Sequence, residues 1–152
     1  MNVIPSKIEI INEVNLLLTQ KIATLSALAK EAQAAANTEQ KSSMGDKYET
    51  ARAMSQATAD QYAKQLSEAH QMQEYFAAIK YKDVYTMVAL GSVVRSNMGL
   101  YFVAVSLGKV AVHDTEIMCI SVHSPLGQAL IGKSIAQKMV FRGVSYEITA
   151  IY

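Results

Sequence analysis

Residues 121–133 read Ser-Val-His-Ser-Pro-Leu-Gly-Gln-Ala-Leu-Ile-Gly-Lys, and this stretch decides the fold of the second half of the chain. A strand leads into it, Ser124 is a favourable N-cap, and Pro125 fits the first position of a helix. Gly132 is typical of a helix stop. Two further strands follow at residues 138–141 and 144–151, and the Arg-Gly pair between them suits a two-residue hairpin loop. The segment therefore predicts a strand, a short helix and a closing β-hairpin.

Upstream of this stretch, runs rich in Val, Ile, Tyr and Phe predict four more short strands. Turn residues separate them, because Asn97-Met98-Gly99 and Leu107-Gly108 supply positive backbone φ angles. A twisted antiparallel sheet packed against one short helix is an α+β arrangement. The four strands are expected at about Ser92–Arg95, Leu100–Ser106, Val110–Val112 and Met118–Val122.

The first half of the chain has a helical period instead. Residues 1–80 contain one Gly and one Pro, and two stretches place small or apolar residues at alternating spacings of three and four. Between them, residues 41–46 (Lys-Ser-Ser-Met-Gly-Asp) predict a turn, with Asp46 as the N-cap of a second helix. We therefore expect an antiparallel coiled-coil hairpin over residues 1–80, with its tip near residues 42–49, and a separate domain over residues 81–152. The expected seam residues are Ile8, Ile11, Asn15, Leu18, Ile22, Leu25, Ala29, Ala32 and Ala36 on the first helix, and Tyr48, Ala51, Ser55, Thr58, Tyr62, Leu66, Ala69, Gln73, Phe76 and Ile79 on the second.

Composition narrows the class of protein and of partner. The chain has 152 residues, of which 51% are hydrophobic, and a formal net charge of +1. That charge gives no reason to expect duplex DNA as a partner, since proteins that bind it are usually strongly basic. One cysteine, Cys119, cannot form an internal disulfide, and its apolar neighbours predict that it is buried. No apolar run has the length of a membrane span, and the start lacks the pattern of a signal peptide, so a cytoplasmic location without membrane contact is expected.

The order of these features resembles the Gre transcript-cleavage factors of bacterial RNA polymerase. Their C-terminal domain carries the pattern I-S-x-x-S-P-(L/I/M)-(A/G)-x-x-L-(I/L)-G-K followed by two strands, and residues 120–133 fit that pattern at every specified position. The resemblance implies an FKBP-like fold for residues 81–152 and a coiled coil that enters the secondary channel of the polymerase. It also implies that Ser124, Pro125 and Leu126 lie near the docking contact on the rim of that channel.

Asp46 and Glu49 are the strongest candidates for chemistry. Carboxylates three residues apart at a helix start share a face and suit a hard cation. The same pair fits a capping box, in which the side chains bind backbone N–H groups, and the local residues leave both interpretations open. The Gre resemblance implies that Asp46 and Glu49 hold a Mg²⁺ shared with the polymerase and position a water that cuts backtracked RNA near its 3′ end. In that case the chain is an accessory factor without a cofactor of its own, not an enzyme.

The tip departs from the family pattern, and this leaves alternatives. The family sequence runs approximately Gly-Asp-x-x-Glu-Asn-x-Glu-Tyr-x-x-Ala-Arg, whereas here Lys47 alone separates Gly45-Asp46 from Tyr48-Glu49. Asp46 then matches the family Asp, and Glu49 replaces the family Glu. The alternatives are a non-cleaving homologue that occupies the channel and modulates or inhibits transcription, and a general protein-interaction module. An FKBP-like domain also raises prolyl isomerase activity, but residues 81–152 have no Trp and only two Phe to line a proline pocket.

Overall fold

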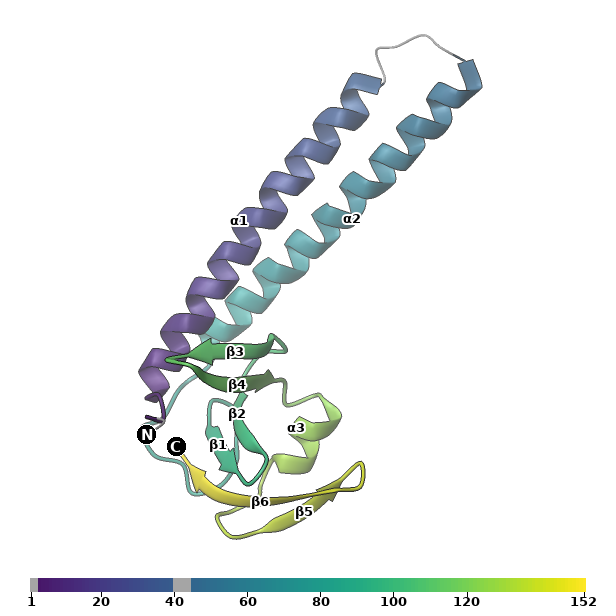
Figure 1. The fold of residues 1–152 in the computed structure, drawn as a ribbon. Coiled ribbons are helices and arrows are strands. Elements are labelled where there is room, and N and C mark those ends of the chain that lie inside the picture. The colour runs from purple at the N-terminus through teal and green to yellow at the C-terminus, as the bar shows by residue number, and fades with distance from the viewer. Residues whose placement is uncertain (1–2, 40–44) are drawn as a thin grey trace. The chain divides into compact units, whose positions relative to one another are not determined.

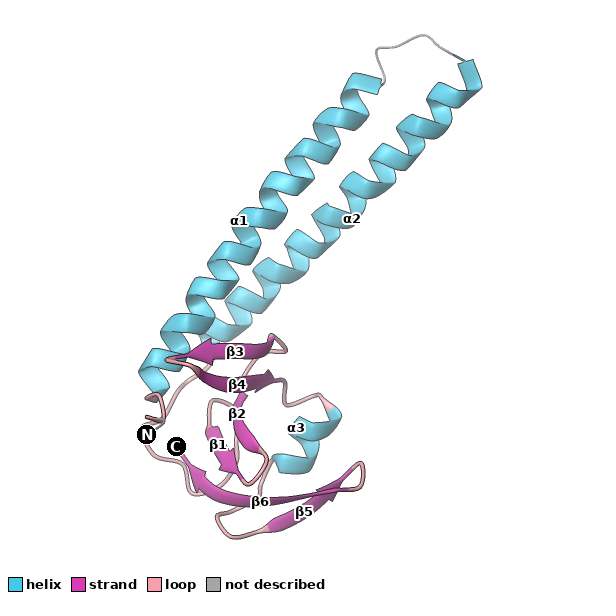
Figure 2. Ribbon diagram, in the orientation of Figure 1, coloured by secondary structure: helices cyan, strands magenta, loops and turns pink. Residues whose placement is uncertain are grey.

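The computed structural model describes residues 3–39 and 45–152, with side chains for residues 3–38 and 49–152. Two long helices come first, and a six-stranded sheet with one short helix follows (Figures 1 and 2). The predicted α+β class is confirmed. The elements are α1 (Lys7–Glu39), α2 (Gly45–Ala78), β1 (Val93–Ser96), β2 (Gly99–Val103), β3 (Gly108–Val112), β4 (Thr115–Ile120), α3 (Pro125–Leu130), β5 (Lys138–Phe141) and β6 (Val144–Ile151).

The sheet is mixed, which corrects the expected antiparallel sheet. Its strand order is β3-β4-β2-β1-β6-β5, and every pairing is antiparallel except that of β2 with β4. The reason is the β3–β4 hairpin. After β2 the chain forms β3 at the edge of the sheet, running opposite to β2. It then turns back as β4 between β3 and β2, so β4 is antiparallel to β3 and parallel to β2. The apolar residues Ile117, Cys119 and Ile120 suit this central position, since all three are buried.

Two compact units emerge from the packing of the chain. One consists of residues 15–74, which form most of α1 and α2, and we call it the helical unit. The other, the sheet unit, consists of residues 1–14 and 75–152, and so includes the first turns of α1 and the end of α2. The expected division after residue 80 follows the change of secondary structure, and α2 indeed ends at Ala78.

In the helical unit, α1 and α2 pack against each other along a seam of mostly small side chains. Leu18, Leu25 and Ala36 are its buried residues on α1, and Ala59 and Ala69 are those on α2. A reciprocal amide pair joins the helices, because Gln33 Nε2 donates to Gln56 Oε1 over 3.1 Å and Gln56 Nε2 donates to Gln33 Oε1 over 3.0 Å. Of the predicted seam residues with described side chains, those buried are Leu18, Leu25 and Ala36 on α1, Ala69 and Phe76 on α2, and Ile79 directly after α2. Asn15, Ala51 and Thr58 are exposed, and Ala59 is buried where Thr58 was predicted. The predicted seam residue Tyr48 has its side chain outside the described residues.

The first turns of α1 depart from the predicted seam. Ile8 is 69% exposed, whereas Ile10 and Val14 are fully buried. These residues belong to the sheet unit. The 3–4 spacing continues through this region, but by itself it did not predict which positions are buried.

The core of the sheet unit is built from large side chains. Phe76, at the end of α2, is 1% exposed and lies edge-on to Phe102 of β2, with ring centroids 6.1 Å apart. On the other face of β2, Tyr101 and Val103 join Ile120 and Leu130, so α3 covers that face of the sheet. Cys119 is 2% exposed, as predicted, and burial raises the pKa of its thiol to about 12.

Candidate functional site

The segment that resembles the Gre pattern forms a tight, capped helix. Ser124 is the N-cap of α3, and its Oγ accepts a hydrogen bond from the Gly127 amide over 3.0 Å. The same hydroxyl donates to the Ser121 carbonyl over 2.7 Å. Pro125 occupies the first turn, where its missing N–H has no intrahelical partner to lose. The predicted start of this helix is therefore confirmed.

Gly127 is required by a close backbone approach. A Cβ at this position would lie 2.0 Å from the Ser121 carbonyl oxygen, a distance that no side chain tolerates. The contact brings the first turn of α3 against the backbone of Ser121, the residue that follows β4. The small residue that the sequence pattern specifies here thus has a structural cause.

The end of α3 is anchored to the segment that precedes β1. Leu130 is fully buried, and Gly132 has a φ of 81°, which favours glycine. The Gly132 amide donates to the Val88 carbonyl, and the Val88 amide donates to the Lys133 carbonyl, both over 2.8 Å. The Leu-Ile-Gly-Lys part of the pattern therefore holds the end of α3 to the backbone of Val88, in the segment before β1.

The three predicted docking residues differ in what they offer a partner. Ser124 is half-buried and has both of its hydroxyl bonds inside the protein. Leu126 is also half-buried and packs against the core. Pro125 is exposed, and exposed His123 and Gln128 flank it in the sequence. Pro125 is thus the member of the predicted set with its side chain at the surface.

The two predicted acidic residues lie in the first turn of α2. The helix begins at Gly45, so Asp46 lies inside it and not at the predicted N-cap. Helical backbone from residue 45 to Glu49 places the two positions three apart on one face. Glu49 is exposed, while the side chain of Asp46 and the tip residues 42–44 lie outside the described residues.

A hollow of about 470 Å³ begins at Glu49 and follows one face of α2. Its lining residues are spaced by three or four, as expected for one side of a helix. Acidic groups lie at its two ends, with an arginine beside the first. The lining residues are Glu49, Arg52, Ala53, Gln56, Ala57 and Asp60.

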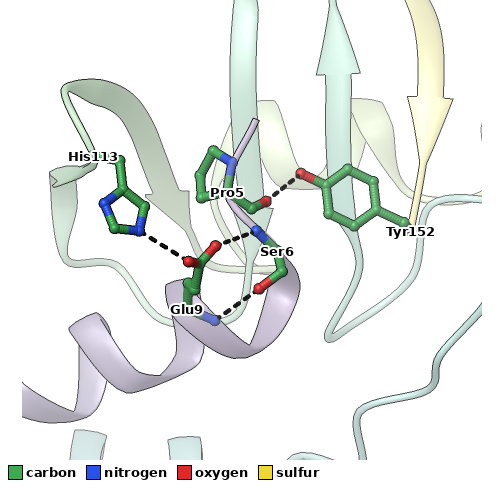
Figure 3. Close-up of polar contacts among 5 residues, drawn as sticks. All are labelled: Pro5, Ser6, Glu9, His113 and Tyr152. Carbon is green, nitrogen blue, oxygen red and sulfur yellow. Dashed lines mark hydrogen bonds and ion pairs between the residues drawn. The ribbon is translucent and has the colours of Figure 1, made fainter. Parts of the chain in front are cut away.

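The sequence prediction missed a polar cluster at the start of α1 (Figure 3). Glu9 accepts a hydrogen bond from the Ser6 amide over 2.8 Å, and its own amide donates to Ser6 Oγ over 3.3 Å. The bond from the Ser6 amide, followed by the bond from His113, lowers the pKa of Glu9. His113 Nε2 lies 2.9 Å from Glu9 Oε1, and the Tyr152 hydroxyl donates to the Pro5 carbonyl over 3.2 Å.

Part of this cluster was readable from the sequence. Ser6-Lys7-Ile8-Glu9 is an S-x-x-E capping box immediately before a helical pattern. No local pattern pairs Glu9 with His113, which is more than a hundred residues away along the chain. That contact depends on the sheet bringing the β3–β4 turn next to the start of α1.

Comparison with known proteins identifies no family. Neither a protein-family model nor a curated protein sequence matches the chain. Among the described residues, no group of three or more His, Cys, Asp or Glu side chains is placed to hold a metal ion. None of the helices in that part of the chain combines the length and apolarity needed to cross a membrane.

Proposed function

We propose that this protein is a Gre-like transcription elongation factor that binds bacterial RNA polymerase at its secondary channel. The sheet unit would dock on the channel rim with Pro125 at the contact, and the helical unit would enter the channel. The observation that carries the proposal is one of order. A chain that forms two long helices, the second with Asp46 and Glu49 near its start, continues into a sheet unit whose α3 segment fits the Gre pattern from Ile120 to Lys133.

The proposed activity is stimulation of the polymerase's own cleavage of backtracked RNA. Asp46 and Glu49 are three residues apart in helical backbone, so both carboxylates can approach one cation from one side of α2. Mg²⁺ is commonly held by one or two carboxylates together with water and phosphate oxygens, so a pair suits a site completed by the polymerase and the RNA. When bound there, the metal would lower the pKa of a water for attack on the RNA phosphate.

Asp46 and Glu49 would then act together in that reaction. The carboxylates would hold charge beside the RNA 3′ end, and the rigid helix would fix their spacing. The isolated chain would neither cleave RNA nor bind Mg²⁺ tightly, because two carboxylates are an incomplete ligand set. Catalysis would thus remain a property of the complex.

A second candidate is a non-cleaving factor that occupies the channel. The observation that favours it is the shortened tip, in which Lys47 alone separates Asp46 from the residues that correspond to the family helix. In this case Asp46 and Glu49 would serve the helix start, as a carboxylate does near a positive helix end. Binding to polymerase would remain, and RNA cleavage would not occur.

The test uses a stalled, backtracked elongation complex of bacterial RNA polymerase. We expect the wild-type chain to produce shortened transcripts that can be extended again. Asp46→Asn and Glu49→Gln should abolish most of this effect while still competing with wild type for the polymerase. Glu68→Gln, an exposed acid elsewhere on α2, is the matched control and should retain cleavage.

The outcomes separate the candidates. Wild-type binding without cleavage would favour the channel-occupying factor. Cleavage that persists in the Asp46→Asn/Glu49→Gln double variant would remove both residues as metal ligands. An absence of binding by the wild-type chain would reject the polymerase as partner.

A further inference from the structure

β5 forms one outer edge of the sheet and has a partner on one side only. It pairs with β6 through the registers Lys138–Glu147, Met139–Tyr146, Val140–Ser145 and Phe141–Val144. In the described part of the chain, residues 138–141 make no other backbone hydrogen bond. An unpaired edge of this kind is a template on which another chain can add a strand.

The hairpin geometry shows which backbone groups are available. Arg142 and Gly143 form the two-residue loop, with φ angles of 51° and 78°. In such a hairpin the closing pair Phe141–Val144 is hydrogen-bonded, and pairs then alternate along the strands. The N–H and C=O groups of Lys138 and Val140 therefore point away from β6, toward the free edge.

The two faces of β5 have different chemistry. Met139 and Phe141 are half-buried and pack against the core on the side of α3. Lys138 and Val140 lie on the opposite face, and Val140 is 73% exposed. A strand added beside β5 would continue this alternation, with apolar side chains next to Met139 and Phe141 and polar ones next to Lys138.

The charged residues near β5 indicate that the polar side chains of an added strand would be acidic. From Ile117 to Tyr146 the chain has no Asp or Glu, whereas Lys133, Lys138 and Arg142 are cationic. Lys138 has a distant ion pair with Glu147, at 4.0 Å, and both side chains are largely exposed. Acidic side chains on an added strand would therefore meet Lys138, whose ion pair is long and exposed, and Arg142, for which the described residues provide no acidic partner.

The same charges disfavour a second copy of this chain as the occupant. If two β5 edges paired antiparallel with their Val140 residues opposite each other, Lys138 of each copy would face Arg142 of the other. Like charges directly opposite across strands are destabilising. A nucleic acid would use the cations, but it would leave the edge N–H and C=O groups and the half-buried apolar face without a matching partner.

We propose that the outer edge of β5 binds an extended segment of a partner protein in which acidic and apolar residues alternate. The segment adds a seventh strand, accepts and donates backbone hydrogen bonds at Lys138 and Val140, and places its acids beside Lys138 and Arg142. This inference does not depend on the proposed polymerase function. It assigns a second protein-binding surface, distinct from the Pro125 region.

The test measures binding of a synthetic peptide to the full-length, isotope-labelled chain. The probe is a blocked peptide of alternating Glu and Val. Its matched control has the same composition with the Glu and Val residues in separate blocks. We expect the alternating peptide to shift the backbone amide signals of Lys138 and Val140 and the control peptide to leave them unchanged.

Two proline variants provide a matched pair on the protein side. Val140→Pro removes an N–H that points to the free edge, so β5–β6 pairing is retained. Ala111→Pro is its equivalent on β3, because Ala111 pairs with Glu116 next to the closing pair Val112–Thr115 of the other two-residue hairpin. Val140→Pro should weaken peptide binding about tenfold, which corresponds to the upper end of the range for the net contribution of one hydrogen bond. Ala111→Pro should leave peptide binding unchanged.

Charge is tested with Lys138→Gln/Arg142→Gln, which should also weaken binding and remove its dependence on salt. The inference is overturned if the alternating peptide shifts no β5 amide, or if Val140→Pro binds it as well as Ala111→Pro does. It is equally overturned if single-stranded RNA shifts the β5 amides and the peptide does not. Each variant is first shown to be folded by its amide spectrum. Val140→Thr, which retains the N–H, should bind normally, and if Val140→Pro unfolds, binding by Lys138→Gln/Arg142→Gln at the wild-type level overturns the inference.

Discussion

The helical unit and the sheet unit stabilise themselves with different side chains, although the two halves of the sequence are both rich in apolar residues. Among the described side chains of the helical unit, three of the five that are buried are alanines, namely Ala36, Ala59 and Ala69. The sheet unit instead buries Phe76, Phe102 and branched side chains. Because burial stabilises roughly in proportion to apolar area, the helical unit has much less stabilisation per residue. The difference shows that a seam built largely of alanine leaves the helices dependent on a few large residues.

Truncation of Phe76 should cause the largest loss of stability, because its large side chain is almost fully buried. Phe76 lies on α2 but belongs to the sheet unit. Phe76→Ala would leave a cavity beside Phe102 and Tyr81, and we expect a loss of about 4 kcal/mol in the free energy of unfolding. Denaturant unfolding followed by the near-ultraviolet signal of Phe and Tyr measures this loss. Tyr75→Ala, at the 41% exposed neighbouring position, should have little effect. If only the helical signal weakened in Phe76→Ala, Phe76 would belong to the helical unit instead.

Gly127→Ala sharpens the comparison within the sheet unit. Its Cβ would clash with the Ser121 carbonyl oxygen, and we expect a loss of about 3 kcal/mol from the backbone shift that must follow. Thermal unfolding of the full chain gives the change. Gln128→Ala, at the next and exposed position of α3, is the control. A Gly127→Ala protein as stable as wild type would show that α3 can move away from the end of β4 at low cost.

Leu25→Ala tests the dependence of the helical unit on its few large residues. Leu25 is 7% exposed, and its truncation should cost about 2 kcal/mol, enough to unfold a marginal pair of helices first. Far-ultraviolet circular dichroism should then show an early helical transition, while the near-ultraviolet signal of the sheet unit melts later. Leu16→Ala, on the same helix but 50% exposed, should change neither. A single transition shared by both signals would contradict the independence of the two cores.

The smallest expected effect concerns pH and the capping box at the start of α1. A carboxyl whose pKa is lower in the folded than in the unfolded state stabilises the fold above its unfolded pKa, and this stabilisation is lost as the pH falls through the folded value. Glu9 is such a group. At neutral pH the wild-type chain should therefore melt at a higher temperature than Glu9→Gln, and the difference should shrink as the solution becomes acidic. A difference that stays constant across that range would show that the charge of Glu9 is not responsible.

Periodicity and turn chemistry account for most of what could be predicted. The bounds of β5 and β6 match the prediction, and α3 begins at Pro125, because Ser-Pro, Arg-Gly and Gly132 constrain the backbone through local sterics. The other strands were placed to within about three residues. For the candidate site, the sequence predicted only which residues to consider. Pro125 and Glu49 are exposed, as a binding or catalytic role requires. Their roles stay predictions.

Other features arise from contacts between residues far apart in sequence. The parallel pairing of β2 with β4 was missed because strand patterns carry no direction, and the order of strands is decided by which arrangement covers the apolar faces. The phase error at Ile8 also concerns burial that spacing did not predict, since Ile10 and Val14 are the buried residues of that part of α1 and belong to the sheet unit. The contact between Glu9 and His113 likewise exists only once the β3–β4 turn is in place.

The sequence by itself determined the two long helices, the short strands, the capped α3 and the α+β class, because these follow from backbone preferences and from apolar periods that act over a few residues. Only the tertiary structure decided the mixed sheet, the inclusion of both helix ends in the sheet unit, and the exposure of β5 as a free edge with a half-buried apolar face. Those outcomes depend on which distant surfaces bury each other. That choice is made by the total apolar area removed from water, a quantity that no local stretch of sequence contains.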